Sequence, residues 1–432
     1  MSSINVAQLL AVCVRASLAA QHYVMLNIVK LPDVEEKLAQ AHDASLETSA
    51  KHPRTLLDLS AVEKAILMDS LHQAVKIDVK SHLDYKEDEA AEDLVTTADV
   101  LVQAVLIRAL SESFPALPFT VIGEEDQPSS AVAKEAETCI TSYYRAITTM
   151  PYEAELYAHL QAGNYFNPSA SAGVVLHADS EATMRRRLGI FIDPIDGTNC
   201  FVGGFWQAPM TLVSITLDGV PIAGIMNRFF SYPLTSNTTR AATTQPREKA
   251  CVPGLSVLLN MPDFASPFIV FDGELMPSPE TSGMQPQCTF DTALAVCCSS
   301  TTKEVFLQRL MTQLDPCNSV RLRGAGYKQY QLIRKMLKGR HAPHEIITPA
   351  DVFVSPPSTI KKWDCCAPHA FLYAFGGDVF NQDGAPLRYP LVDADGASAA
   401  SSFEIAALPK GLVAVTPYAR QEVARRLGWV DE

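Results

Sequence analysis

The 432-residue sequence has no excess of positive charge: 35 Lys and Arg residues stand against 48 Asp and Glu, a formal net charge of −13. Such a surface repels polyanions, which excludes nucleic acid as a partner of the surface as a whole. The phosphate-cradling GxxxxGK[ST] segment of P-loop enzymes is also missing. A small anionic substrate is still compatible with the sequence, because bound cations reverse the local field.

The ten cysteines show no metal-finger spacing, so we expect reduced, buried thiols. The N-terminal apolar run has no basic residue before it, and we interpret it as neither a signal peptide nor a membrane span. Leu9, Cys13, Ala16 and Ala20 have helical spacing there and predict an amphipathic helix. No peroxisomal tripeptide closes the sequence. These features together predict a cytoplasmic protein without a membrane partner.

Hydrophobic residues make up 47% of the chain and charged residues 19%, which predicts two or three domains, or two lobes sharing a site. The first 85 or so residues have mostly helical periodicity, and a strong helix pattern follows Asp99, its predicted cap. Residues 127–185 are less regular and suggest an insertion. The Ser- and Pro-rich stretches 232–250 and 275–287 predict surface loops.

Short apolar runs at 119–122 and 188–192 predict strands, and 210–225 predicts two strands around an Asp218-Gly219 turn. The second half alternates strand and helix patterns, with a helix over 371–375 that ends at Gly376-Gly377. This alternation predicts a mixed α/β layered fold.

The central motif is Asp193-Pro194-Ile195-Asp196-Gly197-Thr198, which follows a buried strand. Two carboxylates and a backbone carbonyl form a hard-oxygen site suited to Mg²⁺. Free N–H groups at a helix start suit a phosphate. Metal and phosphate would thus lie side by side, as phosphoryl hydrolysis requires. The alternative is a plain strand-to-turn junction, because Asp, Pro and Gly are common turn residues.

Three more acidic segments lie at expected element boundaries: Gly123-Glu124-Glu125, Lys362-Trp363-Asp364 and the stretch from Asp93 to Asp99. Taken singly, each has a structural explanation: the first is a solvated acidic turn, the second provides Asp364 as a helix N-cap, and the third is the end of an acidic run. Four such segments are hard to explain as four independent caps.

Together these motifs resemble the inositol monophosphatase superfamily of magnesium-dependent, lithium-sensitive phosphatases. The resemblance implies alternating helix and sheet layers, with an N-terminal α+β lobe over 1–215 and a C-terminal α/β lobe over 216–432. It implies two or three Mg²⁺ ions, inhibition by Li⁺, and a metal-activated water as the nucleophile. The implied metal ligands are Asp93, Glu124, Asp193, Ile195 (through its carbonyl), Asp196 and Asp364. Asp93, Glu124 and Thr198 would be the catalytic residues, with Thr198 hydrogen-bonded to Asp93.

The resemblance leaves two substrate classes open. The long separation between Glu124 and Asp193, and the segment Gly324-Ala325-Gly326-Tyr327-Lys328, favour an inositol polyphosphate 1-phosphatase. Gly197 and the segment 361–368 favour a 3′(2′),5′-bisphosphate nucleotidase. The implied substrate contacts are Gly197, Thr198, Thr301, Lys303, Gly324, Ala325, Lys328 and Thr359. For the two lysines, the alternative is an ordinary surface position.

Other functions fit less well. A sugar phosphatase of the fructose-bisphosphatase type shares the expected fold, but the Trp363-Asp364 segment argues against it. A catalytically inactive phosphate-binding scaffold should have lost an acidic ligand or the Thr198 hydroxyl, and all are present. We therefore expect an enzyme acting on a small phosphorylated substrate, as a monomer or homodimer.

Overall fold

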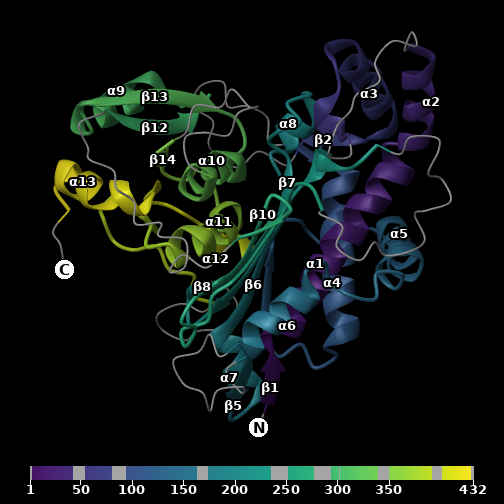
Figure 1. Ribbon diagram of the computed structural model, residues 1–432, viewed down its shortest axis with the longest axis horizontal. Coiled ribbons are helices and arrows are strands. Elements are labelled where there is room, and N and C mark those ends of the chain that lie inside the picture. Colours follow the sequence, from purple (N-terminus) through teal and green to yellow (C-terminus); the bar gives the residue numbers. More distant parts are fainter. Residues whose placement is uncertain are drawn as a thin grey trace.

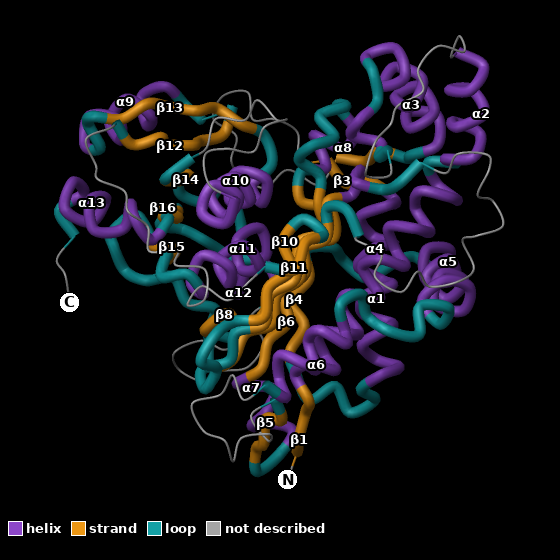
Figure 2. The backbone as a smooth tube through the Cα atoms, viewed as in Figure 1, coloured by secondary structure: helices purple, strands orange, loops and turns teal. Residues whose placement is uncertain are grey.

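Two β-sheets separated and flanked by helices form the molecule, as Figures 1 and 2 show. The computed structural model describes residues 2–41, 54–79, 94–162, 174–234, 252–276, 293–300, 302–338, 350–391 and 401–429. Helices α1 (Val6–Tyr23) and α4 (Thr97–Ser113) cover one face of the larger sheet, and α10 (Ala325–Lys338) and α11 (Trp363–Ala374) lie between the two sheets. The predicted mixed α/β layered fold is confirmed.

The N-terminal region is mostly helical in its described part, as predicted. Besides α1, its elements are β1 (Ser2–Asn5), the π-helix η1 (Val24–Ile28), α2 (Leu31–Ala41), the 3₁₀-helix η2 (Leu56–Asp58), α3 (Ala61–Ala74), β2 (Ile77–Val79) and β3 (Leu94–Thr96). Strand β1 pairs antiparallel with β5 (Val175–Ala178), and β2 with β3.

Helix α1 is buried except for one narrow, partly exposed stripe, formed by Gln8, Ala11, Arg15, Leu18 and His22. The predicted apolar face of Leu9, Cys13, Ala16 and Ala20 is fully buried, as expected of an amphipathic helix. By length and composition alone, the apolar run Val6–Ile28 is sufficient to cross a membrane, a test that buried core helices also pass. Most of it is packed inside the protein, which is typical of a core helix.

Helix α4 begins with a capping box. Thr96 is the N-cap, its hydroxyl accepts from the Asp99 N–H, and the Asp99 carboxylate accepts from the Thr96 N–H at 2.8 Å. Asp99 is therefore the third residue of the helix and not its cap. It is only 1% exposed, so its negative charge is held inside the protein.

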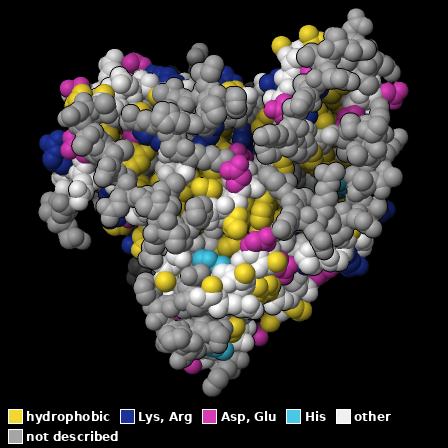
Figure 3. All heavy atoms as spheres, viewed as in Figure 1, with side chains coloured by type: hydrophobic (Ala, Val, Ile, Leu, Met, Phe, Trp, Pro, Cys, Tyr) yellow, Lys and Arg dark blue, Asp and Glu magenta, His cyan; other side chains and the backbone are white. Residues whose placement is uncertain are grey.

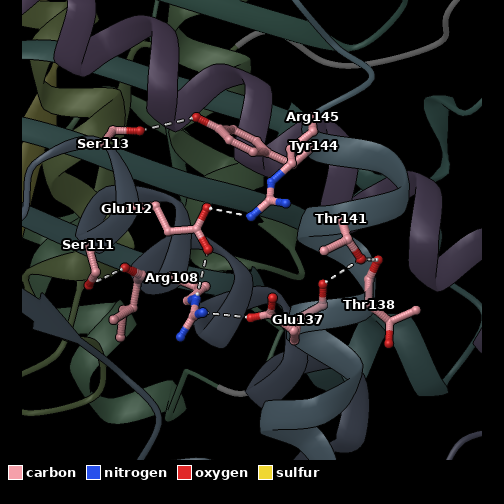
Figure 4. A network of polar contacts seen from close by, with 10 residues as sticks. Arg108, Ser111, Glu112, Ser113, Glu137, Thr138, Thr141, Tyr144 and Arg145 are labelled. Atoms are coloured by element: carbon pink, nitrogen blue, oxygen red, sulfur yellow. Dashed lines mark hydrogen bonds and ion pairs between the residues drawn. The ribbon is translucent and has the colours of Figure 1, made fainter.

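Residues 127–185 are more regular than predicted where they are described. They contain α5 (Ser130–Cys139), η3 (Ile140–Tyr144), α6 (Glu153–Gln161), β5 and most of α7 (Glu181–Arg187). Figure 4 shows how this region is attached to α4: Arg108 pairs with Glu112 at 3.0 Å and with Glu137 of α5 at 2.7 Å. Arg145 reaches Glu112 at 3.4 Å. These exposed pairs add specificity more than stability.

The larger sheet has seven strands in the order β11-β10-β9-β8-β7-β6-β4. They are β4 (Thr120–Gly123), β6 (Leu188–Asp196), β7 (Met210–Leu217), β8 (Val220–Arg228), β9 (Leu255–Leu259), β10 (Phe268–Phe271) and β11 (Glu274–Leu275). The predicted hairpin at Asp218-Gly219 is confirmed, with both residues at positive φ. The predicted lobe boundary at 215–216 falls inside β7, within this sheet. Of the predicted surface loops, 235–250 and 277–287 lie outside the described residues.

The smaller sheet has the order β13-β12-β14-β16-β15. Its elements, with the connecting and covering helices, are β12 (Leu294–Ser299), α9 (Glu304–Gln313), β13 (Cys317–Leu322), β14 (Val352–Ser355), β15 (Asp378–Phe380), α12 (Ser402–Ala406), β16 (Leu412–Val415) and α13 (Pro417–Leu427). Strands β13 and β14 both run parallel to β12, so the carboxyl ends of all three meet at one edge.

Helix α11 lies so close over β8 that only glycine fits at position 224. A Cβ there would lie 2.6 Å from the carbonyl oxygen of Ala367 and 3.3 Å from Cβ of Ala370. Helix α11 ends at Ala374, before Gly376 at φ +84°, which confirms the predicted stop. The contact with β8 sets the height of α11 above the larger sheet.

We expect Gly224→Ala to lower the free energy of unfolding by about 1–3 kcal/mol, because the new methyl group must push α11 away from β8. Urea denaturation measures the loss. Val305→Ala, which truncates a side chain that is 80% exposed, is the control and should change stability little. Equal stabilities of the two variants would contradict the tight contact.

Candidate active site

Strand β6 carries two acidic residues at its carboxyl end. It continues through the whole segment Leu188–Asp196, four residues beyond the predicted strand, with an irregularity in its pairing to β7 between Asp193 and Asp196. Both aspartates are buried, at 1% and 3% exposure. Gly197 then turns the chain in the left-handed conformation, φ +84°, into the five-residue helix α8 (Thr198–Val202). A helix therefore starts after Gly197, as predicted, but it is only five residues long.

Asp364 joins these two residues from α11. One oxygen from each of Asp193, Asp196 and Asp364 lies within 4.8 Å of the other two. The Asp364 carboxylate accepts a hydrogen bond from the Lys361 N–H before α11, although the N-cap position belongs to Lys362. The sequence pattern of two carboxylates three residues apart, with a third from a distant helix, thus forms one cluster.

The start of α10 holds Asp196 in place. Its carboxylate accepts from the Ala325 N–H at 3.2 Å and from the Gly326 N–H at 2.9 Å. The positive end of the helix dipole favours the ionised carboxylate. The Gly324-Ala325-Gly326 segment, which the resemblance implied as a substrate contact, therefore already bonds a member of the acidic cluster.

Asp193 has a different environment. Both of its carboxylate oxygens are buried, and neither accepts from an N–H or hydroxyl group among the described residues; the side chain interacts with the Asp364 carboxylate, another member of the cluster. A buried carboxylate in this state is costly unless a cation or a proton compensates it. The three carboxylates are the oxygen donors that Mg²⁺ prefers, so the residues present fit that ion.

The pKa values of the three carboxyl groups also indicate that their negative charge is poorly compensated. Burial, with a further contribution from the charge of Glu124, raises the pKa of Asp193 well above its usual range. Burial raises the pKa of Asp196 to about 6, against hydrogen bonds from α10, and burial with the charge of Asp196 raises the pKa of Asp364 to about 7. The charge of Lys328 opposes the rise for Asp196, but the pKa values of all three carboxyl groups remain raised.

Glu124 follows β4, which pairs parallel with β6, so the ends of these two strands lie together. Its backbone N–H donates to the Ile192 carbonyl at 3.2 Å, and its charge acts on all three aspartates. The Ile195 carbonyl accepts from the Thr198 hydroxyl at 3.2 Å. Both groups are thus beside the cluster.

Thr198 makes a contact that differs from the one implied. Its hydroxyl donates to Asp99 Oδ1 at 2.9 Å, whereas the resemblance implied Asp93 as the partner. The physical reason is the capping box, which turns the Asp99 side chain back over the start of α4 and toward α8. Asp93, and with it the implied third ion site, lies outside the described residues.

The implied substrate contacts have diverse environments. Lys303 and Thr359 are exposed on loops after β12 and β14, at the edge where the parallel strands end. Lys328 is only 4% exposed, so the alternative of an ordinary surface lysine is wrong for this residue. Its Nζ lies 5.3 Å from the centroid of the Phe353 ring, and its charge acts on Asp196 and Asp364. Thr301 lies outside the described residues.

Sequence reasoning missed the role of Asp99 and of the Gly326 N–H. For Asp99 the Thr-x-x-Asp spacing was visible, but that pattern predicts only a capping box. Contact with Thr198, 99 positions away, depends on the packing of α8 against β3.

We expect Mg²⁺ to raise the melting temperature, and to raise it more at pH 8 than at pH 5.5. Without the ion, the folded state with raised carboxyl pKa values binds more protons than the unfolded state between about pH 4 and 7. Stability therefore falls as pH rises through that range. Ion binding requires the ionised carboxylates and offsets this loss.

Thermal unfolding with Mg²⁺ and with a chelator at the two pH values measures the difference. Asp196→Asn should reduce the Mg²⁺-dependent gain, since the cluster loses a charge. A gain that does not depend on pH, or that survives in the variant unchanged, would contradict a cation site built on these carboxylates.

Comparison with known proteins identifies similar enzymes. Rat 3′(2′),5′-bisphosphate nucleotidase 1 is 27% identical over 305 residues, which cover 69% of this chain and 75% of that protein. Mouse inositol polyphosphate 1-phosphatase is 26% identical over 332 residues, 71% and 76% of the two chains. A solved structure of a staphylococcal IMPase-I complexed with products covers 84% of this chain and 90% of its own, with 12% identity and a TM-score of 0.45.

The family model of the inositol monophosphatase family matches residues 53–410, a range that contains every residue of the acidic cluster and Thr198. The chain therefore belongs to the inositol monophosphatase family of metal-dependent phosphatases.

Proposed function

We propose that this protein is a Mg²⁺-dependent phosphomonoesterase of the cytoplasm that removes the 1-phosphate of inositol polyphosphates such as inositol 1,4-bisphosphate. The observation that carries the proposal is the position of the Thr198–Asp99 pair beside three carboxylates within 4.8 Å of one another, two of them buried and one half-buried. Thr198 follows Asp196 by two residues, so its hydroxyl group lies on the same turn of the chain as a member of the acidic cluster.

Asp193, Asp196 and Asp364 would hold Mg²⁺, with Glu124 and the Ile195 carbonyl beside them. Bound Mg²⁺ would lower the pKa of a coordinated water and neutralise the charge that develops on the leaving oxygen. Asp193 is the central ligand in this assignment, because its two oxygens accept from no N–H or hydroxyl group among the described residues.

Thr198 and Asp99 would manage the proton of the attacking water. The Thr198 hydroxyl donates to Asp99 Oδ1, so its oxygen lone pairs are available to accept a hydrogen bond from a water. As that water loses its proton to Thr198 Oγ1, the hydroxyl proton passes to Asp99 Oδ1. General base assistance of this kind contributes about 10²–10⁴-fold to a rate.

A covalent thiol mechanism does not fit the site. Cys200 is the nearest thiol to the Gly197 turn, with its Sγ 3.8 Å from the point where a Cβ on Gly197 would lie. Burial raises the pKa of Cys200 to about 11, and the charge of Asp196 adds to that rise. The thiol is therefore protonated at neutral pH and a poor nucleophile. Water is left as the attacking group.

A second candidate is a 3′(2′),5′-bisphosphate nucleotidase acting on adenosine 3′,5′-bisphosphate. Gly197 favours it, because inositol polyphosphate phosphatases often carry serine at this position, and glycine provides no hydroxyl group near the phosphate. The rat nucleotidase and the mouse inositol polyphosphate enzyme match this chain at nearly equal identity. We place the inositol substrate first because of the long segment between Glu124 and Asp193 and the Tyr327-Lys328 sequence.

We expect Thr198→Ala to lower kcat by roughly 10²–10⁴-fold with little change in KM, because the water loses its proton acceptor while the metal ligands stay. Steady-state phosphate release measures both constants. Thr198→Ser keeps the hydroxyl and is the matched control, with most of the activity retained. A variant whose KM alone rises would make Thr198 a binding group only.

The substrate is tested by phosphate release from inositol 1,4-bisphosphate and adenosine 3′,5′-bisphosphate side by side, with Mg²⁺ and with or without Li⁺. We expect preference for the inositol substrate, and uncompetitive inhibition by millimolar Li⁺. Preference for the nucleotide would establish the second candidate. Absence of Mg²⁺-dependent release from both would refute the phosphatase proposal.

A further inference from the structure

Five basic residues lie on or beside the loops that follow the parallel strands β12, β13 and β14. The loops meet at one edge of the smaller sheet, because Ser299 and Leu322, the last residues of β12 and β13, are register partners and β14 runs parallel to β12. The edge adjoins the acidic cluster, since Ala325 and Gly326 after β13 donate to Asp196. The basic residues are Lys303, Arg321, Arg323, Lys361 and Lys362.

Four of the five are engaged within the protein. Arg321 donates to the carbonyls of Ser300 and Thr302 and pairs with Glu304 at 2.6 Å. The Nζ of Lys361 lies 3.9 Å from the Phe403 ring centroid, and Lys362 donates to the Ile405 carbonyl at 2.8 Å. Lys303 also has an interaction partner. Arg321 thus fixes the loop after β12, and three of its five N–H donors are used in doing so.

Arg323 is the exception. It is exposed, and within the described part of the chain no carboxylate, carbonyl or ring is recorded against its guanidinium. The next residue, Gly324, lies against the phosphate-binding turn: its Cα would be 3.7 Å from a Cβ placed on Gly197. The backbone of Arg323 therefore lies beside this turn, and its guanidinium has no partner among the described residues.

The side chain also acts electrostatically on that turn. Burial raises the pKa of the Cys200 thiol, three residues after Gly197, and the positive charges of Lys328 and Arg323 oppose the rise. Figure 3 shows Lys and Arg side chains beside the notch between the arm that holds β12, β13 and α10 and the arm that holds α3 and α8. In a protein of net charge −13, such cations attract an anion to one place.

We propose that Arg323 is a specificity-determining residue that binds the second, non-reacting phosphate of the substrate. This inference rests on the proposed phosphatase function and narrows it to substrates that carry at least two phosphates. A guanidinium matches a phosphate with two parallel N–H donors, and leaving water costs it less than it costs an ammonium group. In this assignment the backbone N–H groups of the Gly197 turn bind the reacting phosphate, and Arg323 adds only a long-range attraction to it, so the loss of Arg323 costs a substrate with one phosphate less than a substrate with two.

The test compares inositol 1,4-bisphosphate with inositol 1-phosphate on the full-length protein in Mg²⁺. Arg323→Ala should lower kcat/KM for the bisphosphate roughly 10- to 100-fold, mainly through KM, and lower the monophosphate value at most about threefold. Arg323→Lys should retain part of the preference. Arg309→Ala, which removes an exposed arginine from α9, is the matched control and should alter neither substrate. Adenosine 3′,5′-bisphosphate and adenosine 3′-monophosphate form the equivalent pair if the nucleotide is preferred.

An equal loss on both substrates, or no loss on either, would overturn the proposal. If the wild-type protein releases no phosphate, the phosphatase proposal fails, and calorimetric titration with inositol 1,4-bisphosphate then tests Arg323 separately. A dissociation constant that Arg323→Ala raises at least tenfold would support the anion site, whereas an unchanged constant would refute it. Far-UV circular dichroism verifies that each variant is folded.

Discussion

The site depends on three carboxylates, two buried and one half-buried, that lie within 4.8 Å of one another. Like charges at this separation in a poorly solvated place repel strongly, and burial alone already disfavours their ionised forms. Part of the cost is offset by the α10 N–H groups on Asp196 and the Lys361 N–H on Asp364. Asp193 receives no such help among the described residues, so the arrangement is stable at neutral pH when a cation completes it.

The layers of the fold hold these groups at their separation. Strand β6 ends in the larger sheet, α11 is seated over β8 by Gly224, and α10 starts from the end of β13 in the smaller sheet. The acidic cluster thus joins three elements from both sheets, and a shift of α11 against β8 would move Asp364 relative to Asp193. Packing far from the metal ligands therefore controls the geometry in which they bind.

Asp99 illustrates how one side chain serves structure and chemistry together. Its Oδ2 closes the capping box with Thr96, and its Oδ1 accepts from Thr198. The same bonds that begin α4 orient the carboxylate toward the acidic cluster, so no separate element is needed to position it. Arg321 and Arg323 show the opposite division. Both are exposed and they lie two residues apart, but Arg321 bonds the loop after β12, whereas Arg323 precedes Gly324, which lies against the Gly197 turn.

The sequence by itself determined the layered fold, the hairpin at Asp218-Gly219, the end of α11 and the acidic motifs, because turn chemistry and short apolar runs are local signals. It misjudged the regularity of 127–185, because the helices there are ordered by packing against α4 and α1, which local periodicity does not reveal. Only the tertiary structure decided that Thr198 pairs with Asp99, that Lys328 is buried, and that α10 bonds Asp196. Those contacts join residues 99 to 130 positions apart, and they form only when the two sheets pack around α10 and α11.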